Sequence, residues 1–252
     1  MILLLDIGNT RIKWGCLIDG EFQSGGVQSR GDGGVASVIA VVQARQYRPL
    51  HVVVSNVADD GYCEQLRSEV NVAWGCQVEV VATQAAAFGV VNGYDEPHRL
   101  GVDRWMALIA ARQLCDGALC IVDCGTALTV DLLTGKGEHL GGMIVPGMSL
   151  LQDALVKNTE GLHAISARRA GDEAYFMARN TVDAMSSGAR YSLVALIDRV
   201  FADAQRSLGE GVSLVLTGGD ASMLRPHLQC EGVFEPDLVL NGVAIVARGV
   251  NQ

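Results

Sequence analysis

The chain is short of charged and aromatic residues, and among its charged residues the basic ones are the minority. Charged residues make up 19% and aromatic residues 5% of the 252 positions, while 49% are hydrophobic. This composition supplies ample core for one large domain or two small ones and is not that of a disordered protein. Lysine and arginine number 19 against 28 acidic residues, which gives a net charge of -9. Such a balance argues against nucleic acid as the main partner.

Long hydrophobic runs are also missing. No apolar run approaches the roughly 18 residues that a membrane span needs. The segment Met1–Leu5 is apolar, but it lacks the basic start and the length of a signal peptide, and Asp6 interrupts it. We therefore expect a soluble, cytoplasmic protein that has no membrane partner.

The patterns that mark several kinds of site are absent too. The seven cysteines are scattered and odd in number, with no CxxC pair and no Cys/His cluster at the spacing of zinc ligands. We expect reduced thiols, as in cytosolic proteins. The five histidines are dispersed and support no Ser/His/Asp arrangement, and the GK[ST] sequence of a Walker A motif does not occur.

What the chain does contain is a short phrase that occurs twice. One apolar run ends in Asp6-Ile7-Gly8-Asn9-Thr10, and a second ends in Asp123-Cys124-Gly125-Thr126-Ala127. Each predicts a buried strand that enters a tight turn with a carboxylate at its tip. Two such tips, at the starts of two halves, predict a duplicated fold with a cleft between the halves. Two carboxylates beside two turns rich in Gly and Thr suit a nucleoside triphosphate and its metal.

The two halves carry a similar predicted order of elements, which is three strands and then helix, strand, helix and strand. In the first half, the strands are expected over 2–6, 11–18, from 21, 51–54 and 78–81, and the helices around 35–42, over 63–70 and over 103–115. In the second half, the strands are expected over 119–123, 128–133, 139–144 and 213–216, followed by an apolar stretch over 234–239, and the helices over 149–157, about 180–208 and 241–248.

This order resembles that of the actin-like ATPase superfamily. We place the boundary near Asp116-Gly117, which gives an N-terminal domain over 1–116 and a C-terminal domain over 117–252. The expected fold class is α/β, with two duplicated actin-like (ribonuclease H-like) domains, mixed sheets and an interdomain cleft.

The first turn contains the groups that a triphosphate needs. Gly8 permits close approach of the backbone, and Asn9 and Thr10 supply amide and hydroxyl donors. Lys13 is placed to reach a phosphate oxygen, and Asp6 supplies a carboxylate for Mg²⁺, directly or through water. The alternative is an ordinary hairpin turn rich in Gly and Asn, and the second copy of the phrase favours the functional interpretation.

In the second turn, Asp123 would bind a cation and Thr126 a phosphate. Thr129 and Asp131 share one face of the next strand, and we expect Asp131 to be a solvated charge at a strand end. The segment Thr217-Gly218-Gly219-Asp220 ends an apolar strand and opens a helix. Its glycines would let the chain pass close to an adenine or a ribose, and a helix N-terminus favours anions. The alternative is a plain joint in which Asp220 caps the helix.

The candidate for chemistry is Gly101-Val102-Asp103-Arg104, at the mouth of a predicted helix. A kinase needs a base, or at least an acceptor, for the attacking hydroxyl, and Asp103 would provide it. A small anionic substrate also needs a positive partner, for which Arg104 or Arg179 is available. The alternative is that Asp103 is a simple helix N-cap.

Together these segments resemble the type III pantothenate kinases. The resemblance rests on Asp6–Lys13, Gly101–Trp105, Val122–Ala127 and Gly141–Gly147, in the family's order and spacing, and it covers essentially the whole chain. It implies ATP-dependent phosphorylation of pantothenate to 4'-phosphopantothenate, the first step of coenzyme A biosynthesis. It also implies ATP with Mg²⁺, a monovalent cation (K⁺ or NH₄⁺) and a homodimer.

The resemblance further implies a role for each matching residue. Asp123 would bind the monovalent cation, and Asp103 would be the general base. Thr181 would reach pantothenate, in this family from the partner subunit. The expected ATP-binding residues are Asp6, Ile7, Gly8, Asn9, Thr10, Arg11, Ile12, Lys13 and Thr126, and the expected pantothenate-binding residues are Tyr94, Gly101, Val102, Asp103, Arg104 and Thr181.

Two other functions stay open at this point. Another sugar or acid kinase on the same fold would use the same two phosphate turns, and a screen of acceptors separates it from a pantothenate kinase. A relative of this family is described as an accessory factor for transcription, so a non-catalytic regulator is the third alternative. The presence of Asp6, Asp103 and Asp123 argues against a loss of catalysis, and the acidic charge argues against direct contact with DNA.

Overall fold

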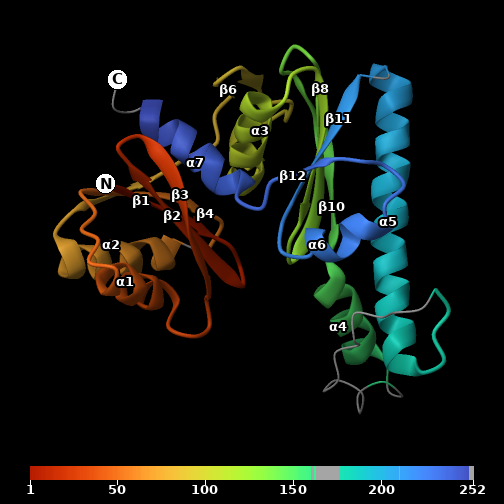
Figure 1. Cartoon of the computed structure of the whole chain (residues 1–252), viewed down its shortest axis with the longest axis horizontal. Coiled ribbons are helices and arrows are strands. Elements are labelled where there is room, and N and C mark those ends of the chain that lie inside the picture. Colours follow the sequence, from red (N-terminus) through yellow and green to blue (C-terminus); the bar gives the residue numbers. More distant parts are fainter. Residues whose placement is uncertain (59, 160–161, 163–175, 210, 250–252) are drawn as a thin grey trace. The chain divides into compact units, whose positions relative to one another are not determined.

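The computed structural model describes residues 1–58, 60–159, 162, 176–209 and 211–249, and its contacts divide the chain into two compact units (Figure 1). The first unit holds Met1–Asp116, Lys136–His139 and Asp237–Gln252. The second unit holds Gly117–Gly135 and Leu140–Pro236. The division into domains at 1–116 and 117–252 stays a prediction, and the compact units differ from it by two segments that pack with the first unit.

The first unit is built on a five-stranded sheet in the order β3-β2-β1-β4-β5. An antiparallel hairpin of β1 (Ile2–Ile7) and β2 (Arg11–Ile18) is extended by β3 (Glu21–Ser29). On the other side of β1, the parallel strands β4 (His51–Asn56) and β5 (Gln77–Val80) complete the sheet. β1 is nearly all apolar because helices cover both of its faces.

Helices α1 (Gly34–Ala44) and α2 (Asp60–Trp74) lie on one face of this sheet, and α7 (Leu238–Gly249) lies on the other (Figure 1). α3 (Val102–Leu114) packs against α7. The two helices approach closely because α7 has Gly242 at their contact, where a Cβ atom would overlap the backbone of α3. This packing holds the C-terminal helix in the first unit.

The second unit repeats the plan with a sheet in the order β10-β9-β8-β11-β12. Its strands are β8 (Ala118–Cys124), β9 (Ala127–Leu133), β10 (His139–Pro146), β11 (Val212–Thr217) and β12 (Val233–Phe234). As in the first unit, a hairpin (β8 and β9) adjoins a parallel pair (β8 and β11). The repeated strand order confirms the predicted α/β class with two mixed sheets.

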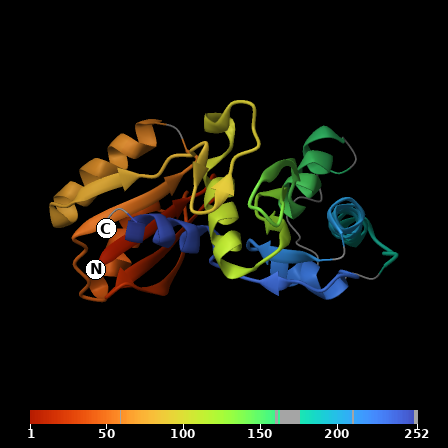
Figure 2. The same cartoon turned by 90° about the horizontal axis from the view of Figure 1, so that it is seen from above.

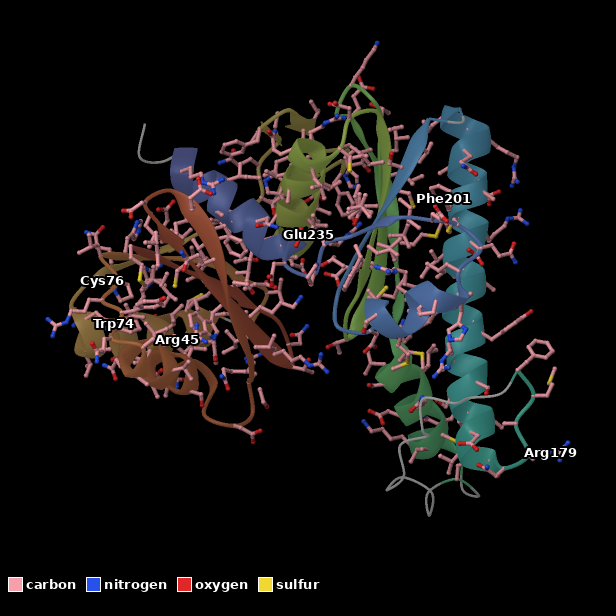
Figure 3. The ribbon with its side chains drawn as sticks, viewed as in Figure 1. Arg45, Trp74, Cys76, Arg179, Phe201 and Glu235 are labelled. Carbon is pink, nitrogen blue, oxygen red and sulfur yellow. The ribbon has the colours of Figure 1, made fainter. Side chains whose placement is uncertain are left out.

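The long helix α5 (Thr181–Leu208) runs beside this sheet and is seen along its axis in Figure 2. Its apolar positions form a stripe in which Leu193, Ile197 and Phe201 recur every four residues and pack into the core. Phe201 is labelled on α5 in Figure 3. Helix α4 (Met148–Asn158) packs against α5. In the described part of the chain, no helix is long and apolar enough to cross a membrane.

Several short elements were not expected from the sequence. Between β5 and α3 lie β6 (Ala86–Ala87), β7 (Val90–Val91) and the 3-10 helix η1 (Pro97–Arg99). The stretch over 234–239 is not one element, because β12 ends at Phe234 and α7 begins at Leu238. After β11, α6 (Ala221–Leu224) is the helix expected after Thr217-Gly218-Gly219-Asp220, whereas η3 (Arg225–His227), which follows it, was not expected.

Candidate functional site

The turn between β1 and β2 presents a carboxylate and an ammonium group together. Asp6 and Lys13 are direct partners across the antiparallel pair, so their side chains leave the sheet on the same face. The amide of Gly8 donates to the carbonyl oxygen of Arg11 at 3.0 Å and closes the turn. Ser55, which is fully buried, pairs with Asp6 from the neighbouring strand β4. A tight turn beside groups of both signs suits a phosphate chain and its counter-ion.

The remaining residues of this turn divide into buried and exposed ones. Ile7 and Ile12 are cross-strand partners whose side chains are fully buried, so only their backbone atoms can meet a nucleotide. Asn9, Thr10 and Arg11 are exposed at the tip of the hairpin. The structure thus keeps the donors predicted for phosphate at the surface.

A residue that the sequence did not single out, Arg30, supports this turn. Its amide donates to the carbonyl oxygen of Thr10 at 2.9 Å, and its Nη1 lies 3.5 Å from the carbonyl oxygen of Asn9. The Arg30 guanidinium also lies 4.5 Å from the centre of the Tyr62 ring on α2. Arg30 reaches the turn because Ser29, the residue before it, pairs with Arg11 in the second hairpin, a register that the sequence alone does not give.

The predicted catalytic segment begins α3. Gly101 is the N-cap of the helix, and its carbonyl oxygen accepts from the amide of Trp105 at 3.0 Å. Asp103 therefore lies in the first turn and is not the N-cap, and its Oδ1 accepts from the amide of Arg104 at 2.8 Å. A Cβ atom at Gly101 would lie 2.6 Å from that oxygen. The half-buried carboxylate lies at the positive end of the helix dipole.

The structure brings Tyr94 and Arg104 together. Arg104 is only 6% exposed, and its Nη1 donates to the Tyr94 hydroxyl at 2.6 Å. The amide of Tyr94 donates to Oδ1 of Asn92 at 3.0 Å, and the Asn92 side chain in turn donates to the carbonyl oxygens of Gln84 and Pro97. These bonds give the loop before α3 a defined shape. A buried guanidinium beside a phenol suits a small anionic substrate.

The second turn of the repeat lies at the end of β8. Asp123 pairs with Thr129 of β9 on one side and with Thr217 of β11 on the other. The carbonyl oxygen of Thr126 accepts from the amide of Gly147 at 3.0 Å. A Cβ atom at Gly147 would overlap this turn, so only glycine fits there. The Gly141–Gly147 segment thereby supports the turn that holds Asp123.

The loop after β11 packs on the same turn. Gly218 has a φ of +92°, and a Cβ atom there would overlap the Asp123 carboxylate and the backbone of Cys124. The amide of Asp220 donates to the carbonyl oxygen of Cys124 at 2.9 Å. Asp220 stands at the N-cap of α6, with no cap hydrogen bond from its side chain. Asp123, Gly218 and Asp220, which are far apart in sequence, thus meet at one end of this sheet.

The thiol of Cys124 lies near the negative charges at this end of the sheet. Burial raises its pKa to about 12, and the negative charges of Asp123 and Asp220 act in the same direction. Two carboxylates beside backbone oxygens suit a cation. The described residues hold no group of three or more His, Cys, Asp and Glu side chains arranged for a metal.

Asp131 differs from its expectation as a solvated charge at a strand end. It is 3% exposed, and its strand β9 lies inside the sheet between β8 and β10. Its negative charge also adds to the burial that raises the pKa of the Cys120 thiol to about 12. The prediction was wrong because strand alternation gives the shared face of Thr129 and Asp131 but not how deeply that face is covered.

Thr181 and Arg179 flank the N-cap of α5. Asn180 is that N-cap, and its Oδ1 accepts from the amide of Asp183 at 3.0 Å. Thr181 is exposed on the first turn, and its hydroxyl is not the capping group. Arg179 is exposed and points away from the helices of its unit (Figure 3). Both side chains are therefore available at the surface of the second unit.

Comparison with known proteins identifies close similarity over the whole chain. A family model described as type III pantothenate kinase matches residues 2–203. A type III pantothenate kinase from Nitrosococcus oceani is 38% identical, over 100% of this chain and 96% of that protein. One from Alkalilimnicola ehrlichii is also 38% identical, over 98% of this chain and 97% of that protein.

Solved structures agree on the fold. A candidate 2-dehydro-3-deoxygalactonokinase from Sinorhizobium meliloti superposes with a TM-score of 0.62 at 14% identity, covering 99% of this chain and 97% of that one. A candidate Baf family transcriptional activator from Campylobacter jejuni superposes with a TM-score of 0.56 at 20% identity, covering 99% and 98%. At these identities the likeness concerns the fold alone, and it agrees with the predicted fold class.

Proposed function

Since the chain belongs to the type III pantothenate kinase family, we propose that it transfers the γ-phosphoryl group of ATP to the primary hydroxyl of pantothenate. The product is 4'-phosphopantothenate, and the reaction belongs to coenzyme A biosynthesis. The observation that carries this proposal is the match to pantothenate kinases along nearly their full length.

In this proposal the β1–β2 turn, Asp6 to Lys13, binds the phosphates of ATP. The exposed donors at the tip and the Lys13 ammonium neutralise and orient the phosphate chain, because phosphoryl transfer depends mainly on positioning and on charge stabilisation. Arg30 keeps the tip in shape through its bonds to the carbonyl oxygens of Asn9 and Thr10. Thr126, in the second turn of the repeat, is a further contact to ATP.

The acceptor lies at the start of α3. Pantothenate is a small carboxylate, and the buried Arg104 guanidinium with the Tyr94 hydroxyl suits it. Gly101 and Val102 complete the contact through the first turn of the helix. Asp103 takes the proton of the attacking hydroxyl, or orients that hydroxyl when the transition state is loose.

The chain also offers fitting groups for two cations. Asp6 provides a carboxylate for Mg²⁺, through water or directly, and Mg²⁺ would offset the charge of the phosphates. Asp123, with the charge of Asp220 nearby, suits K⁺ or NH₄⁺, since the turn around it supplies carbonyl oxygens rather than nitrogen or sulfur ligands. Because residue 218 is a glycine, the space beside the Asp123 carboxylate stays open, whereas any side chain at this position would fill it.

We further propose a homodimer in the cytoplasm. The exposed Thr181 on the first turn of α5 would reach the pantothenate bound by the partner subunit. All seven cysteines are free, which suits a reducing compartment. Analytical ultracentrifugation tests the dimer directly, and a monomer at micromolar concentration would contradict it.

The two alternatives have less support. A different small-molecule acceptor is compatible with the phosphate turns, but the relatives at 38% identity are all named as pantothenate kinases. A solved structure described as a Baf family transcriptional activator shares the fold at 20% identity, which concerns the fold alone. A non-catalytic regulator has no need of Asp6, Asp103 and Asp123 together.

The deciding experiment is ADP release by the purified protein with ATP, Mg²⁺ and pantothenate, first with K⁺ and then with Na⁺ in its place. We expect turnover that needs pantothenate and falls strongly in Na⁺. Turnover with pantothenate that is independent of K⁺ contradicts only the cation site at Asp123 and leaves the kinase activity supported. No turnover in either buffer, from a folded protein, contradicts the phosphorylation of pantothenate, and a screen of other acceptors then separates the two alternatives.

A further inference from the structure

The tip of the β9–β10 hairpin brings a buried histidine to the loop that contains Tyr94. The amide of Val91 donates to the carbonyl oxygen of Gly137 at 2.8 Å, and Val91 also bridges to Glu138. Gly137 has a φ of +84°, and a Cβ atom there would overlap the Gly89 carbonyl, so the approach is close. The next residue after Glu138 is His139, which is 3% exposed. The hairpin tip thus fixes His139 beside the segment that follows β7.

His139 contacts this segment in two ways. Its ring is stacked on the Tyr94 ring, with the centroids 5.9 Å apart and the planes inclined by 15°. The amide of Gly93 donates to Nδ1 of His139 at 3.4 Å. Nδ1 thus serves as the acceptor for the Gly93 amide. The imidazole therefore supplies both a flat apolar surface and a hydrogen-bond acceptor.

Tyr94, in turn, touches Arg104. Besides the hydrogen bond of 2.6 Å to the Tyr94 hydroxyl, the Arg104 guanidinium carbon lies 5.4 Å from the centre of the Tyr94 ring. A guanidinium bonds in fixed directions, so a shift of its neighbour changes where its N–H groups point. His139, Tyr94 and Arg104 form a continuous row from the hairpin tip to the start of α3.

We propose that His139 is a positioning residue of the pantothenate pocket, which holds the Tyr94 ring and, through it, the Arg104 guanidinium in the orientation that receives the acceptor. This inference rests on the proposed function, because the ligand of Tyr94 and Arg104 is assigned there. The alternative is a core histidine whose contacts serve stability only. The two differ in the Michaelis constant for pantothenate, which only a positioning residue changes selectively.

Two substitutions separate the two contacts of the ring. His139→Asn keeps an acceptor near the position of Nδ1 but loses the stacked ring, and His139→Phe keeps the ring but loses the acceptor. We expect each to raise KM for pantothenate by about 5- to 20-fold, with kcat and KM for ATP within about two-fold of the wild type. His98→Asn is the matched control, because the His98 side chain is 75% exposed in the same loop, and it should leave all three constants unchanged.

A third variant tests whether His139 acts through Tyr94. Tyr94→Leu removes the ring on which the imidazole stacks. If the effect passes through that ring, the double variant His139→Phe/Tyr94→Leu has a KM for pantothenate that is raised by less than the product of the two single fold-increases. A double variant whose KM is raised by the full product overturns the proposed row of contacts.

The outcomes keep this inference separate from the function on which it rests. Wild-type turnover with pantothenate is measured first, and its absence contradicts the proposed function. When the wild type is active, an unchanged KM for pantothenate in both folded His139 variants overturns the positioning role, as does a fall in kcat alone. If both variants melt below the assay temperature, their constants are measured below their melting temperatures beside the wild type. An unchanged KM in Tyr94→Leu also overturns the proposal, because it leaves nothing for His139 to position.

Discussion

Asp103, the proposed base, occupies the second position of α3, where local contacts orient its carboxylate. Its carboxylate accepts from the Arg104 amide at 2.8 Å and faces the helix N-terminus, so it is oriented before any substrate binds. A base of this kind contributes mainly by being in place and charged. The same contacts fix the oxygen that would meet a hydroxyl of the acceptor.

Asp103→Asn should therefore lower kcat by about 10² to 10⁴-fold, because an amide keeps the size of the side chain but accepts no proton. The melting temperature should change little, since Asp103 is not the N-cap of its helix. Steady-state ADP release measures the effect. Asp116→Asn, an exposed position just after the same helix, is the control that should retain wild-type turnover. Near-normal turnover in Asp103→Asn would remove the base from the mechanism.

Gly218 and Gly209 have similar backbone angles but different surroundings, so each is a control for the other. Their φ angles are +92° and +95°, but a Cβ atom at Gly218 would overlap the Asp123 carboxylate, while nothing lies within 4 Å of one at Gly209. Gly209→Ala should cost about 1 to 3 kcal/mol for the backbone alone. Gly218→Ala should cost more and raise the K⁺ concentration for half-maximal activity, as measured by titration with K⁺. If both variants have the same K⁺ concentration for half-maximal activity, Gly218 has no part in the cation site.

At the scale of elements, α5 depends on a defined start. Asn180 caps it through the Asp183 amide, and Nδ2 of Asn180 also donates to the Asp183 carboxylate at 2.6 Å. Asn180→Ala should reduce the free energy of unfolding by about 1 kcal/mol, whereas Asn180→Ser retains an acceptor and should lose less. Urea denaturation measures both. If Asn180→Ala is as stable as the wild type, the cap contributes nothing to the folded state.

Most elements could be predicted because each is an apolar run that a turn signal ends. Arg11–Ile18 was predicted with its observed limits, since Asp19-Gly20 ends the strand. The pairs Ala86–Ala87 and Val90–Val91 were missed because two residues carry no periodicity. The start of α7 was missed because Leu238-Val239-Leu240 fits a strand as well as a buried helix.

The candidate site was predictable only in part, for a related reason. Asp6 and Asp123 each end a strong strand pattern and Asp103 opens a strong helical one, so local sequence singles them out as candidates. Arg30 and His139 reach their partners through hairpin register and tertiary packing, which no local pattern encodes. The burial of Asp131 likewise depends on the strands on either side of β9. Residues that support a site are thus harder to find than residues that form it.

At the scale of the whole molecule, buried thiols make stability depend on pH. Burial raises the pKa of Cys16 and Cys230 from 9.0 to about 11, and that of Cys120 and Cys124 to about 12. From about pH 9 to pH 11 for Cys16 and Cys230, and to about pH 12 for Cys120 and Cys124, the unfolded chain has lost protons that the folded chain keeps. The free energy of unfolding therefore falls as pH rises through this range. Well below pH 9 these thiols contribute no slope. Urea denaturation at several pH values measures this. Above about pH 9, the free energy of unfolding should fall less steeply with pH in the double variant Cys16→Ala/Cys120→Ala than in the wild type. Equal slopes would contradict the role of these thiols.

The proposed dimer makes a prediction that concerns the assembly itself. If Thr181 completes the site of the partner subunit, then an Asp103→Asn subunit and a Thr181→Val subunit repair each other in a mixed dimer. The site with an intact Asp103 then receives an intact Thr181, whereas the other site has both defects. Random mixing of equal amounts makes half of the dimers mixed, with one of two sites intact, so activity at low pantothenate should recover to about one quarter of the wild type.

The mixing experiment distinguishes this arrangement from its opposite. If Thr181 served the site of its own subunit, each site of a mixed dimer would contain one defect and no activity would return. Each variant refolded alone through the same denaturation step is the control, and each should show only its own residual rate. Recovery would connect the exposed first turn of α5 to the chemistry at α3 of another chain, which explains why an unburied threonine follows a well-formed helix cap.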